Sequence, residues 1–386
     1  MQTNSLLLPL LPVLPLLGSV LLPLIGRGRT IFWRGWALIA PIGQLLLVGV
    51  MIGQPEPKLN LRWLPDLGLA LDLGLDGLSL AMVGLTALLT ATAILATREE
   101  QPRPGLFFPL LLAVNLGLVG AFLARNALLF VLCFELILIP TTLLVAIWGG
   151  ERRAGGAIRY LIYSAVSGIT LLAAVLAFGL LNANGNSFSY ADLAAADLST
   201  THQRLILALL LVAFGLKLPV VPLHGWQPFT YSEASTPVVV LLGGVVSKLG
   251  AYGLLRFAVG FLPEAWVAWS PWLAGAGAVT AFYGALNAIA QKDMRRLVAY
   301  SSLGHMGLLL LALAAATPLS LQGAVALILA HGTILALLFV LVDLIDRKTG
   351  TTQIAELSGL MNPYRGLPFT LGLLLLALMA SAGIPG

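Results

Sequence analysis

Long apolar runs separated by short polar segments dominate the pattern along the chain. A helix that crosses a bilayer needs roughly 20 predominantly apolar residues. Twelve runs are candidates, near 6–25, 32–53, 77–97, 106–123, 126–148, 157–181, 204–222, 236–260, 269–290, 296–316, 320–346 and 367–386. Alternation with period 2 is taken to be absent, which disfavours an outer-membrane barrel. The pattern therefore predicts an all-α polytopic membrane protein with about 12 transmembrane helices in this chain.

Composition restricts the class of protein further. Of the 386 residues, 59% are hydrophobic and 10% are charged, whereas an ordinary soluble domain carries about 25% charged residues. This excludes a soluble enzyme and a disordered tail. The net charge of +5 is dispersed along the chain, so we expect the lipid bilayer as a partner and no nucleic acid. The first apolar run has no preceding basic residue and no A-x-A site after it, which predicts a retained helix.

The basic residues sort by loop. Fourteen of the 21 Lys and Arg residues lie in odd-numbered loops, five in even-numbered loops and two inside predicted spans. The five assigned to even-numbered loops are Lys58, Arg62, Arg125, Arg204 and Arg256. Because cytoplasmic loops carry the excess of Lys and Arg, we expect the odd-numbered loops in the cytoplasm and the N-terminus on the opposite side.

Three ionisable residues lie well inside predicted spans: Glu135, Lys217 and Lys248. A charge at the bilayer centre costs about 2.5–3.5 kcal/mol on insertion scales, so such residues tend to face a bundle interior and serve ion or proton transfer. Pro219 and Pro222 follow Lys217 directly. Because proline cannot donate a backbone hydrogen bond within a helix, we expect the helix to break there. A broken helix at membrane depth is tolerated only beside protein or a cavity.

Structural alternatives exist for each of these residues. Glu135 could be a neutral acid that bonds a neighbouring helix, and the two lysines could extend toward the membrane surface. His305 and His331 titrate near neutral pH and suit proton relays, although a bonded histidine in a helix bundle is a common purely structural outcome. His224 follows Pro222 and fits a cap as well as a relay. Four histidines without carboxylates at metal-ligand spacing predict no metal site.

Several motifs together resemble one family. The stretch AFGLKLPVVPLHGWQPFTYSEASTPVVVLLGGVVSKLGAYGLLRF is similar to the signature of the antiporter-like membrane subunits of respiratory complex I. Further matches are GLDGLSLAMV, FELILIPTTLLVAIWGG, QKDMRRLVAYSSLGHMG, LAHGTILALLF and the closing GIPG. The single-glutamate fifth span and GAYGLLRF resemble the chain 4 group, and EAST and ELSGL resemble its cyanobacterial and plastid members.

The resemblance implies an architecture of fourteen helices with two inverted five-helix repeats, each containing a broken helix. On this basis we expect three parts. These are N-terminal helices 1–3 in residues 1–105, a first half-channel in 106–260, and a second repeat, cut within helix 12, in 261–386.

The resemblance also implies roles for individual residues. Glu135 and Lys217 match a pair in the family that is thought to switch. Lys248 matches the central-axis lysine of helix eight, and His331 matches a helix-eleven histidine that carries protons onward. We place His305 in the same proton-transfer set.

The function implied is proton translocation within a complex I-like NAD(P)H or ferredoxin:quinone oxidoreductase, so the chain counts as a translocase subunit. We expect no cofactor and no redox centre in this chain, because the family places the redox chemistry in other subunits. The expected partners are other membrane subunits, in a bacterial inner membrane or a cyanobacterial thylakoid. Two alternatives stay open: a subunit of a multi-chain Na⁺/H⁺ antiporter, and a membrane subunit of a specialised CO₂-uptake form with accessory subunits.

The chain departs from the family pattern in three places. Phe229, Thr230 and Tyr231 stand where the family usually has Asp-Ala-His, and Ser235 replaces a proline. The sequence stops at Gly386, within the second broken helix, and the last charged residue of the family's proton line follows that point. We therefore expect the exit half-channel to be incomplete in this chain alone.

Overall fold

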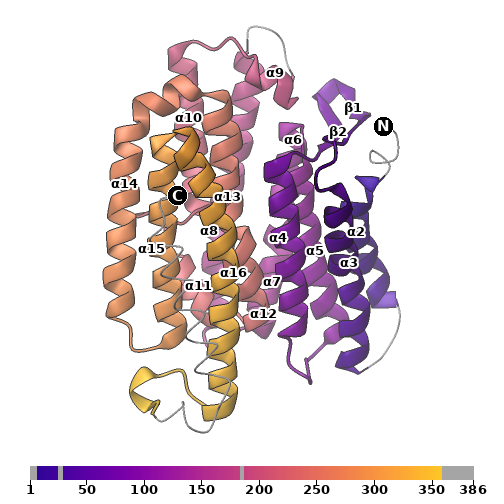
Figure 1. Ribbon diagram of the computed structural model, residues 1–386, viewed down its shortest axis with the longest axis vertical. Helices are drawn as coiled ribbons and strands as arrows, with labels where there is room; N and C mark the ends of the chain where they lie inside the picture. Colours follow the sequence, from indigo (N-terminus) through magenta and orange to yellow (C-terminus); the bar gives the residue numbers. More distant parts are fainter. Residues whose placement is uncertain (1–6, 25–28, 183–186, 359–386) are drawn as a thin grey trace.

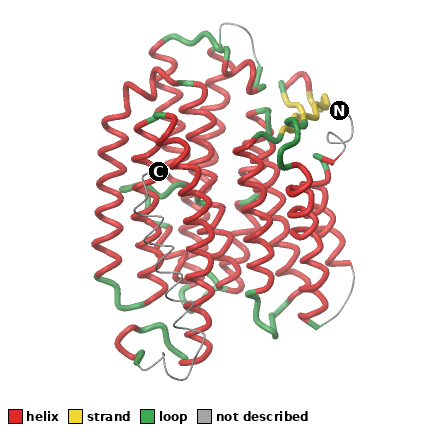
Figure 2. The backbone as a smooth tube through the Cα atoms, in the orientation of Figure 1, coloured by secondary structure: helices red, strands yellow, loops and turns green. Residues whose placement is uncertain are grey.

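The computed structural model describes residues 7–24, 29–182 and 187–358. Within these ranges the chain forms a helical bundle with one small antiparallel hairpin (Figures 1 and 2). The N-terminal elements are α2 (Leu10–Leu21), α3 (Thr30–Met51), β1 (Lys58–Leu64), β2 (Leu69–Gly74), α4 (Gly77–Leu95), α5 (Pro104–Leu123), α6 (Ala127–Leu136) and α7 (Leu138–Trp148). The later elements are α8 (Arg153–Leu181), α9 (Tyr190–Ala194), α10 (Thr200–Lys217), α11 (Gln227–Glu233), α12 (Thr236–Leu241), η3 (Leu242–Val246), α13 (Lys248–Gly253), η4 (Leu254–Val259), α14 (Pro263–Ile289), α15 (Met294–Ala315) and α16 (Pro318–Thr349). Single 3₁₀ turns are η1 (Leu22–Leu24), η2 (Pro65–Leu67) and η5 (Ile354–Glu356).

The all-α membrane architecture is confirmed. In the described ranges nine helical segments are long and apolar enough to cross a membrane, and Leu10–Leu24 adds a shorter apolar helix. Each of the first eleven predicted spans contains a helix, whereas the predicted span 367–386 lies outside the described residues. The inverted repeats and the division at residues 105 and 260 stay predictions.

The hairpin corrects the statement that period-2 alternation is absent. In β1, Leu59, Leu61 and Trp63 alternate with polar residues, and Lys58 pairs with Gly74 at the far end of the register. The Pro-Asp-Leu-Gly turn between the strands supplies the residue types that favour a chain reversal. The strands cover one end of the bundle, beside α6 (Figure 1).

Two interruptions place polar chemistry inside the bundle. The fifth predicted span is divided at Ile137 into α6 and α7, where Pro140 cannot donate to the carbonyl of Leu136. The seventh predicted span ends as a helix at Lys217, and the chain runs through turns before α11 begins at Gln227. The predicted break after Lys217 is therefore confirmed.

The α12–η4 segment forms the interior of the bundle. Almost all of its residues are buried, whereas α14 exposes most of its surface. The turns η3 and η4 are π-helical, a conformation that often marks functional sites. Lys248 is the first residue of α13 and is separated from η3 by Ser247 alone.

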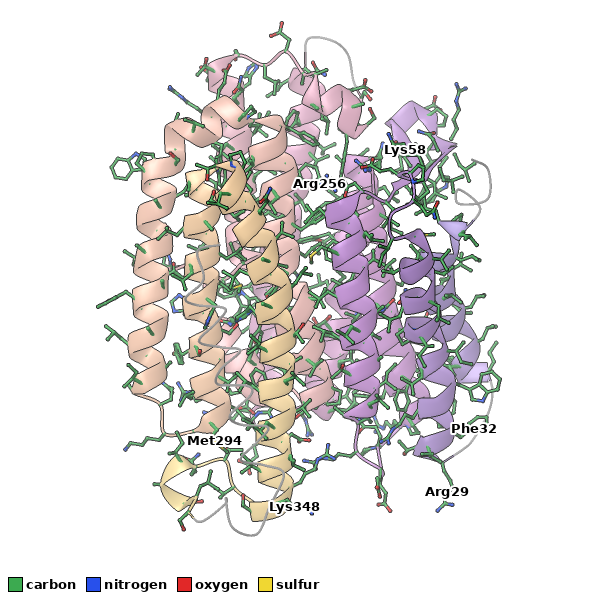
Figure 3. The ribbon with its side chains drawn as sticks, in the orientation of Figure 1. Arg29, Phe32, Lys58, Arg256, Met294 and Lys348 are labelled. Atoms are coloured by element: carbon green, nitrogen blue, oxygen red, sulfur yellow. The ribbon has the colours of Figure 1, made fainter. Side chains whose placement is uncertain are left out.

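The charged ends of the bundle follow the predicted loop pattern. Figure 3 shows Arg29 and Lys348 at one end and Lys58 at the opposite end. Two basic residues that entered the count, Arg27 and Arg365, lie outside the described residues. The loop assignment of Arg256 is corrected, because it lies within η4. Other residues counted in loops lie in the first two turns of helices, among them Arg34 in α3, Arg159 in α8 and Arg204 in α10.

Candidate functional site

Lys217 occupies a buried site at the break in α10. Its side chain is 1% exposed. The Nζ atom donates to Ser164 Oγ at 3.3 Å and to Tyr160 OH at 3.5 Å, both on α8. It also lies 4.8 Å from the centre of the Phe134 ring. Hydroxyls and aromatic faces therefore surround the Nζ atom of Lys217.

Glu135 lies on the last turn of α6, one residue after Phe134. Its Oε1 atom is buried and has no hydrogen-bond partner among the described residues. The carboxylate packs onto Gly168 of α8, so that a Cβ atom there would overlap it. Lys217 acts on Glu135 electrostatically, yet the two form no ion pair within 4.0 Å in the described ranges. The two predicted partners are thus neighbours that are not in contact in this arrangement.

Lys248 is completely buried. Its Nζ atom donates to the carbonyl oxygen of Gly243 at 2.5 Å and to Ser247 Oγ at 3.2 Å. These contacts lie at the π-helical turn η3. There the Ser247 amide donates to the Leu242 carbonyl, five residues earlier, at 3.1 Å. No ion pair to Lys248 occurs in the described part of the chain. A charge here is held only by neutral oxygens.

The two predicted histidines lie against each other. His305 on α15 and His331 on α16 have ring centres 4.9 Å apart. The Nδ1 atom of His305 is 2.9 Å from the Ser301 carbonyl; a carbonyl only accepts, so Nδ1 carries the hydrogen and Nε2 is left as an acceptor when the ring is neutral. His331 Nδ1 is buried without a partner in the described ranges. Both rings are within electrostatic range of Lys248, and of these three residues the structure brings His305 and His331 into contact.

His224 lies apart from these groups, in the turns after α10. Its ring centre is 4.9 Å from that of Tyr283, and its buried Nδ1 atom has no hydrogen-bond partner in the described ranges. The neighbouring helix α11 has no side-chain cap, so the structure does not support the capping interpretation, and the relay interpretation stays a prediction.

The three unusual residues of α11 are buried or packed against neighbouring helices. The Phe229 ring lies 4.0 Å from the guanidinium carbon of Arg159. Thr230 Oγ1 donates to the Gly156 carbonyl at 3.1 Å, and Tyr231 OH donates to the Leu242 carbonyl at 3.2 Å. Each side chain thus has a specific contact in place of the usual Asp-Ala-His.

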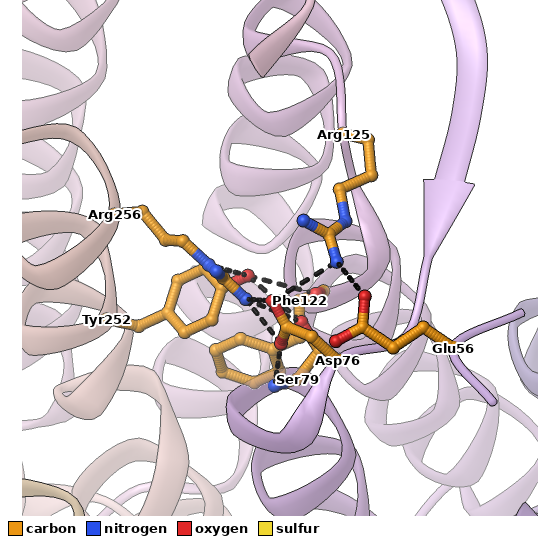
Figure 4. A network of polar contacts seen from close by, with 7 residues as sticks. All are labelled: Glu56, Asp76, Ser79, Phe122, Arg125, Tyr252 and Arg256. Atoms are coloured by element: carbon orange, nitrogen blue, oxygen red, sulfur yellow. Dashed lines mark hydrogen bonds and ion pairs between the residues drawn. The ribbon is translucent and has the colours of Figure 1, made fainter. Parts of the chain in front are cut away.

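An ion-pair cluster that sequence reasoning missed joins α4 to η4 (Figure 4). Asp76 caps α4 by accepting from the Ser79 amide at 2.9 Å. It accepts from Arg256 Nη2 at 2.5 Å through Oδ1, and from Arg125 Nη2 at 3.1 Å through Oδ2. Arg125 also lies 3.9 Å from Glu56. One carboxylate therefore holds two arginines from distant parts of the chain.

Hydroxyls complete the cluster. Arg256 donates through Nη2 to Ser79 Oγ at 3.1 Å and through Nε to Tyr252 OH at 3.2 Å, and Tyr252 OH donates to the Phe122 carbonyl at 3.0 Å. Burial alone would raise the pKa of Asp76, but the charge and hydrogen bond of Arg256 hold that pKa below its ordinary value. One feature of the sequence could have indicated this cluster: Arg256 lies eight residues after Lys248, within one apolar span.

Open space lies on both sides of the buried residues. A cavity of about 650 Å³ beside the cluster is lined by Lys58, Asp72, Arg125 and Arg256, among others. At the opposite end a cavity of about 1050 Å³ is lined by Arg98, Glu233, Arg295 and Asp343, among others. Among the described residues, no group of three His, Cys, Asp or Glu side chains could hold a metal ion.

Comparisons with known proteins address the family directly. Residues 124–386 match the family model described as NADH:quinone oxidoreductase/Mrp antiporter, TM. The chain is 38% identical to NAD(P)H-quinone oxidoreductase chain 4 of Synechococcus sp. (strain WH7803) over 96% of this chain and 69% of that protein. It is 39% identical to chain 4 1 of Synechococcus elongatus over 100% and 72%.

Solved structures agree in fold. A chain of respiratory complex I from Thermus thermophilus has a TM-score of 0.88 and 30% identity, and the match covers 96% of this chain and 78% of that one. The Mrp complex from Dietzia sp. has a TM-score of 0.83 at 23% identity, over 99% and 42% of the two chains, which is a likeness of fold alone. The chain therefore belongs to the family of antiporter-like membrane subunits shared by complex I and Mrp antiporters, in the group of NAD(P)H-quinone oxidoreductase chain 4.

Proposed function

We propose that this chain translocates protons as a membrane subunit of a complex I-like NAD(P)H or ferredoxin:quinone oxidoreductase. The observation that carries the proposal is the burial of Lys217 and Lys248, neither of which forms an ion pair with a carboxylate of the described residues. A buried charge without a counter-ion is costly, and ionisable residues that persist inside membrane-spanning segments commonly serve ion or proton transfer.

The first step of the proposal is a change at Glu135. A neighbouring subunit alters the charge or position of Glu135, which already acts electrostatically on Lys217. Loss of that attraction favours the neutral amine of Lys217, whose proton moves toward Lys248. From Lys248 the proton continues to His305 and His331, which lie within its electrostatic range.

The free energy of moving a proton across the membrane and that of a pKa change at a lysine are similar in size. Moving one elementary charge across 100 mV takes about 2.3 kcal/mol. A change of two pKa units corresponds to roughly 2.7 kcal/mol. A modest change in the electrostatic interaction between Glu135 and Lys217 therefore supplies free energy of the right order.

The family resemblance supports the wider assignment. The curated relatives are named NAD(P)H-quinone oxidoreductase chain 4 and come from cyanobacteria, which favours other membrane subunits as partners and a thylakoid or inner membrane as the location. The excess of basic residues at one end favours a cytoplasmic orientation of that end, with the N-terminus on the opposite side. Electron transfer and quinone reduction belong to other subunits in this proposal, and no cofactor is assigned to this chain.

The test uses the assembled complex in sealed vesicles. Lys217→Ala is expected to lower the number of protons moved per quinone reduced, while Lys348→Ala, at an exposed position near the end of α16, leaves it unchanged. Unchanged pumping in Lys217→Ala would contradict the assignment.

A second candidate function is Na⁺/H⁺ exchange in a multi-chain antiporter. The family description that includes Mrp antiporters favours keeping it. Sodium-dependent proton movement without quinone-linked activity would support exchange, whereas pumping that needs quinone reduction supports the leading proposal. Co-purification of CO₂-uptake accessory subunits would instead indicate the specialised form of the complex.

A further inference from the structure

The cavity beside Asp76 lies at the end of the bundle that carries the hairpin and α9 (Figure 1). Its volume of about 650 Å³ is within the range of roughly 300–1,000 Å³ that is usual for small-molecule sites. Lys58 of β1, Arg125 before α6 and Arg256 of η4 line it. Asp72 of β2 is the one carboxylate among the described residues of the lining. Three cations against one carboxylate favour an anionic ligand.

The two arginines keep hydrogen-bond donors available for such a ligand. Arg125 and Arg256 each bond the Oδ2 atom of Asp76 through Nη2, and they approach it from different sides (Figure 4). Neither Nη1 atom has a hydrogen-bond partner among the described residues, and neither is enclosed by protein. Each guanidinium group can therefore donate to a further oxygen while it stays paired with Asp76.

Two more donors at the wall of the cavity lack an acceptor. The Nε atom of Arg125 and the hydroxyl of Tyr190 are buried and have no hydrogen-bond partner in the described ranges. Tyr190 is 7% exposed and belongs to the lining. Buried polar groups are nearly always hydrogen-bonded, so unpaired donors gathered at one cavity are unusual. They add to the evidence for a ligand that supplies acceptors.

Main-chain hydrogen bonds fix the walls around Arg125. Its amide donates to the Asp72 carbonyl at 2.8 Å, and its carbonyl accepts from the Tyr190 amide at 2.8 Å. The Ala127 amide donates to the Phe188 carbonyl at 2.7 Å. The hairpin, the start of α6 and the segment that leads into α9 are thus joined at one place. A site with fixed walls loses little affinity to ordering when a ligand binds.

The cavity lies at the level where apolar helical segments end. Gly260 and Phe261 of its lining separate the segments Thr236–Val259 and Pro263–Ile289. Arg125 lies two residues before a further apolar segment, which begins with α6. Phe261 and other apolar side chains complete the wall. A lining that is cationic on one part and apolar on another, at this depth, suits the headgroup region of a membrane lipid.

We propose that this cavity binds an organic phosphate, and that its source is the headgroup of an anionic membrane lipid. Lys58 supplies a point charge, and Arg125 and Arg256 supply planar groups of donors that match phosphate oxygens. Because the donors come from three different elements, a tetrahedral phosphate suits them better than a planar carboxylate. Asp72 repels the anion and limits its affinity. The inference goes beyond the proposed function, since no proton transfer enters it.

Lys58 and Arg62 offer a matched pair of variants. Both are exposed cations of β1, but Arg62 does not belong to the lining of the cavity. We expect Lys58→Gln to weaken phosphate binding by about 2–5-fold, the size of an exposed charge pair, and Arg62→Gln to leave it unchanged. Asp72→Asn should tighten binding by a similar factor. Arg125→Lys keeps a charge beside Asp76 but loses the planar donors, and should weaken binding by about tenfold.

The experiment is native mass spectrometry of the purified chain in uncharged detergent. It measures the dissociation constant of the first phosphatidylglycerol molecule bound, with phosphatidylcholine as the zwitterionic reference. We expect tighter binding of phosphatidylglycerol in the unmutated chain, weaker binding in Lys58→Gln and Arg125→Lys, and tighter binding in Asp72→Asn. Opposite effects at Lys58 and Asp72 are expected from a charged ligand in the cavity and not from a general loss of folding.

Other outcomes would overturn the inference. Equal affinities for the two lipids, equal effects of Lys58→Gln and Arg62→Gln, or weaker binding in Asp72→Asn would each contradict the site. Soluble glycerol 3-phosphate is added as a competitor and should displace little of the bound lipid. Full displacement at equal concentration would support the phosphate site and overturn the lipid as its source. Lipid binding is measured without pumping, so its failure leaves the proposed function untouched.

Discussion

Replacing Asp76 with Asn removes the charge that joins α4 to η4. The side chains of Asp76, Arg256 and Arg125 are 15%, 18% and 21% exposed, so the cluster is largely but not fully withdrawn from solvent. Removing one partner of a buried pair costs roughly 3–5 kcal/mol, and partial solvation reduces this, so we expect a loss of about 2–4 kcal/mol. Asn caps a helix about as well as Asp, so the loss reports the ion pairs and not the cap.

The assay is a denaturant titration of the purified chain in micelles, followed by circular dichroism. Asp66→Asn, at an exposed position in the hairpin turn, is the control and should change the free energy of unfolding by less than about 0.5 kcal/mol. Adding Arg256→Gln gives a double-mutant cycle with an expected coupling of about 0.5–3 kcal/mol. A loss below 1 kcal/mol in Asp76→Asn, as for an exposed pair, would refute the reasoning.

Acid should reproduce the same loss in the unmutated chain. The pKa of Asp76 is below its ordinary value in the folded state. Its ionised form therefore stabilises the fold fully above the unfolded value of about pH 4, and this contribution disappears as the pH falls through the folded-state pKa. Asp76→Asn should lack that part of the acid sensitivity. An identical acid profile for the two chains would contradict the assignment of the charge.

Two glycine substitutions test the packing. Gly307→Ala is expected to lower the free energy of unfolding by about 1–3 kcal/mol, because its Cβ atom would collide with the Ala281 backbone where α15 meets α14. Gly275→Ala, which meets nothing within 4 Å, should be neutral or stabilising by up to about 1 kcal/mol, and equal losses at both positions would count against close helix packing. Gly168→Ala should displace the Glu135 carboxylate and lower pumping by the assembled complex, whereas normal pumping would show that its position is unimportant.

The apolar runs predicted the helices well because burial in a bilayer imposes length and hydropathy on each span. The break after Lys217 was also predictable, since proline acts locally through its missing donor. The hairpin was missed although Leu59, Leu61 and Trp63 show a period of 2. Its short strands are set among much longer helical runs, and a pattern of seven residues is a weak signal.

The buried ionisable residues were identifiable one by one from the sequence, but their contacts were not. Glu135, Lys217 and Lys248 stood out because a charge is costly in an apolar run, a property that each position shows alone. That Glu135 packs on Gly168 and does not touch Lys217 depends on how α6, α8 and α10 pack. Arg256 was misassigned for the same reason, because its partner Asp76 lies 180 residues away in the chain.

The most direct test of the proposed proton route is the number of protons moved per quinone reduced when Lys248 is replaced by Met. Lys292→Met, at an exposed position, serves as the control because it removes the same charge outside the buried site. The proposed route predicts a clear fall in this ratio for Lys248→Met and an unchanged ratio for Lys292→Met. The same ratio in both variants and in the unmutated complex would contradict a route through Lys248.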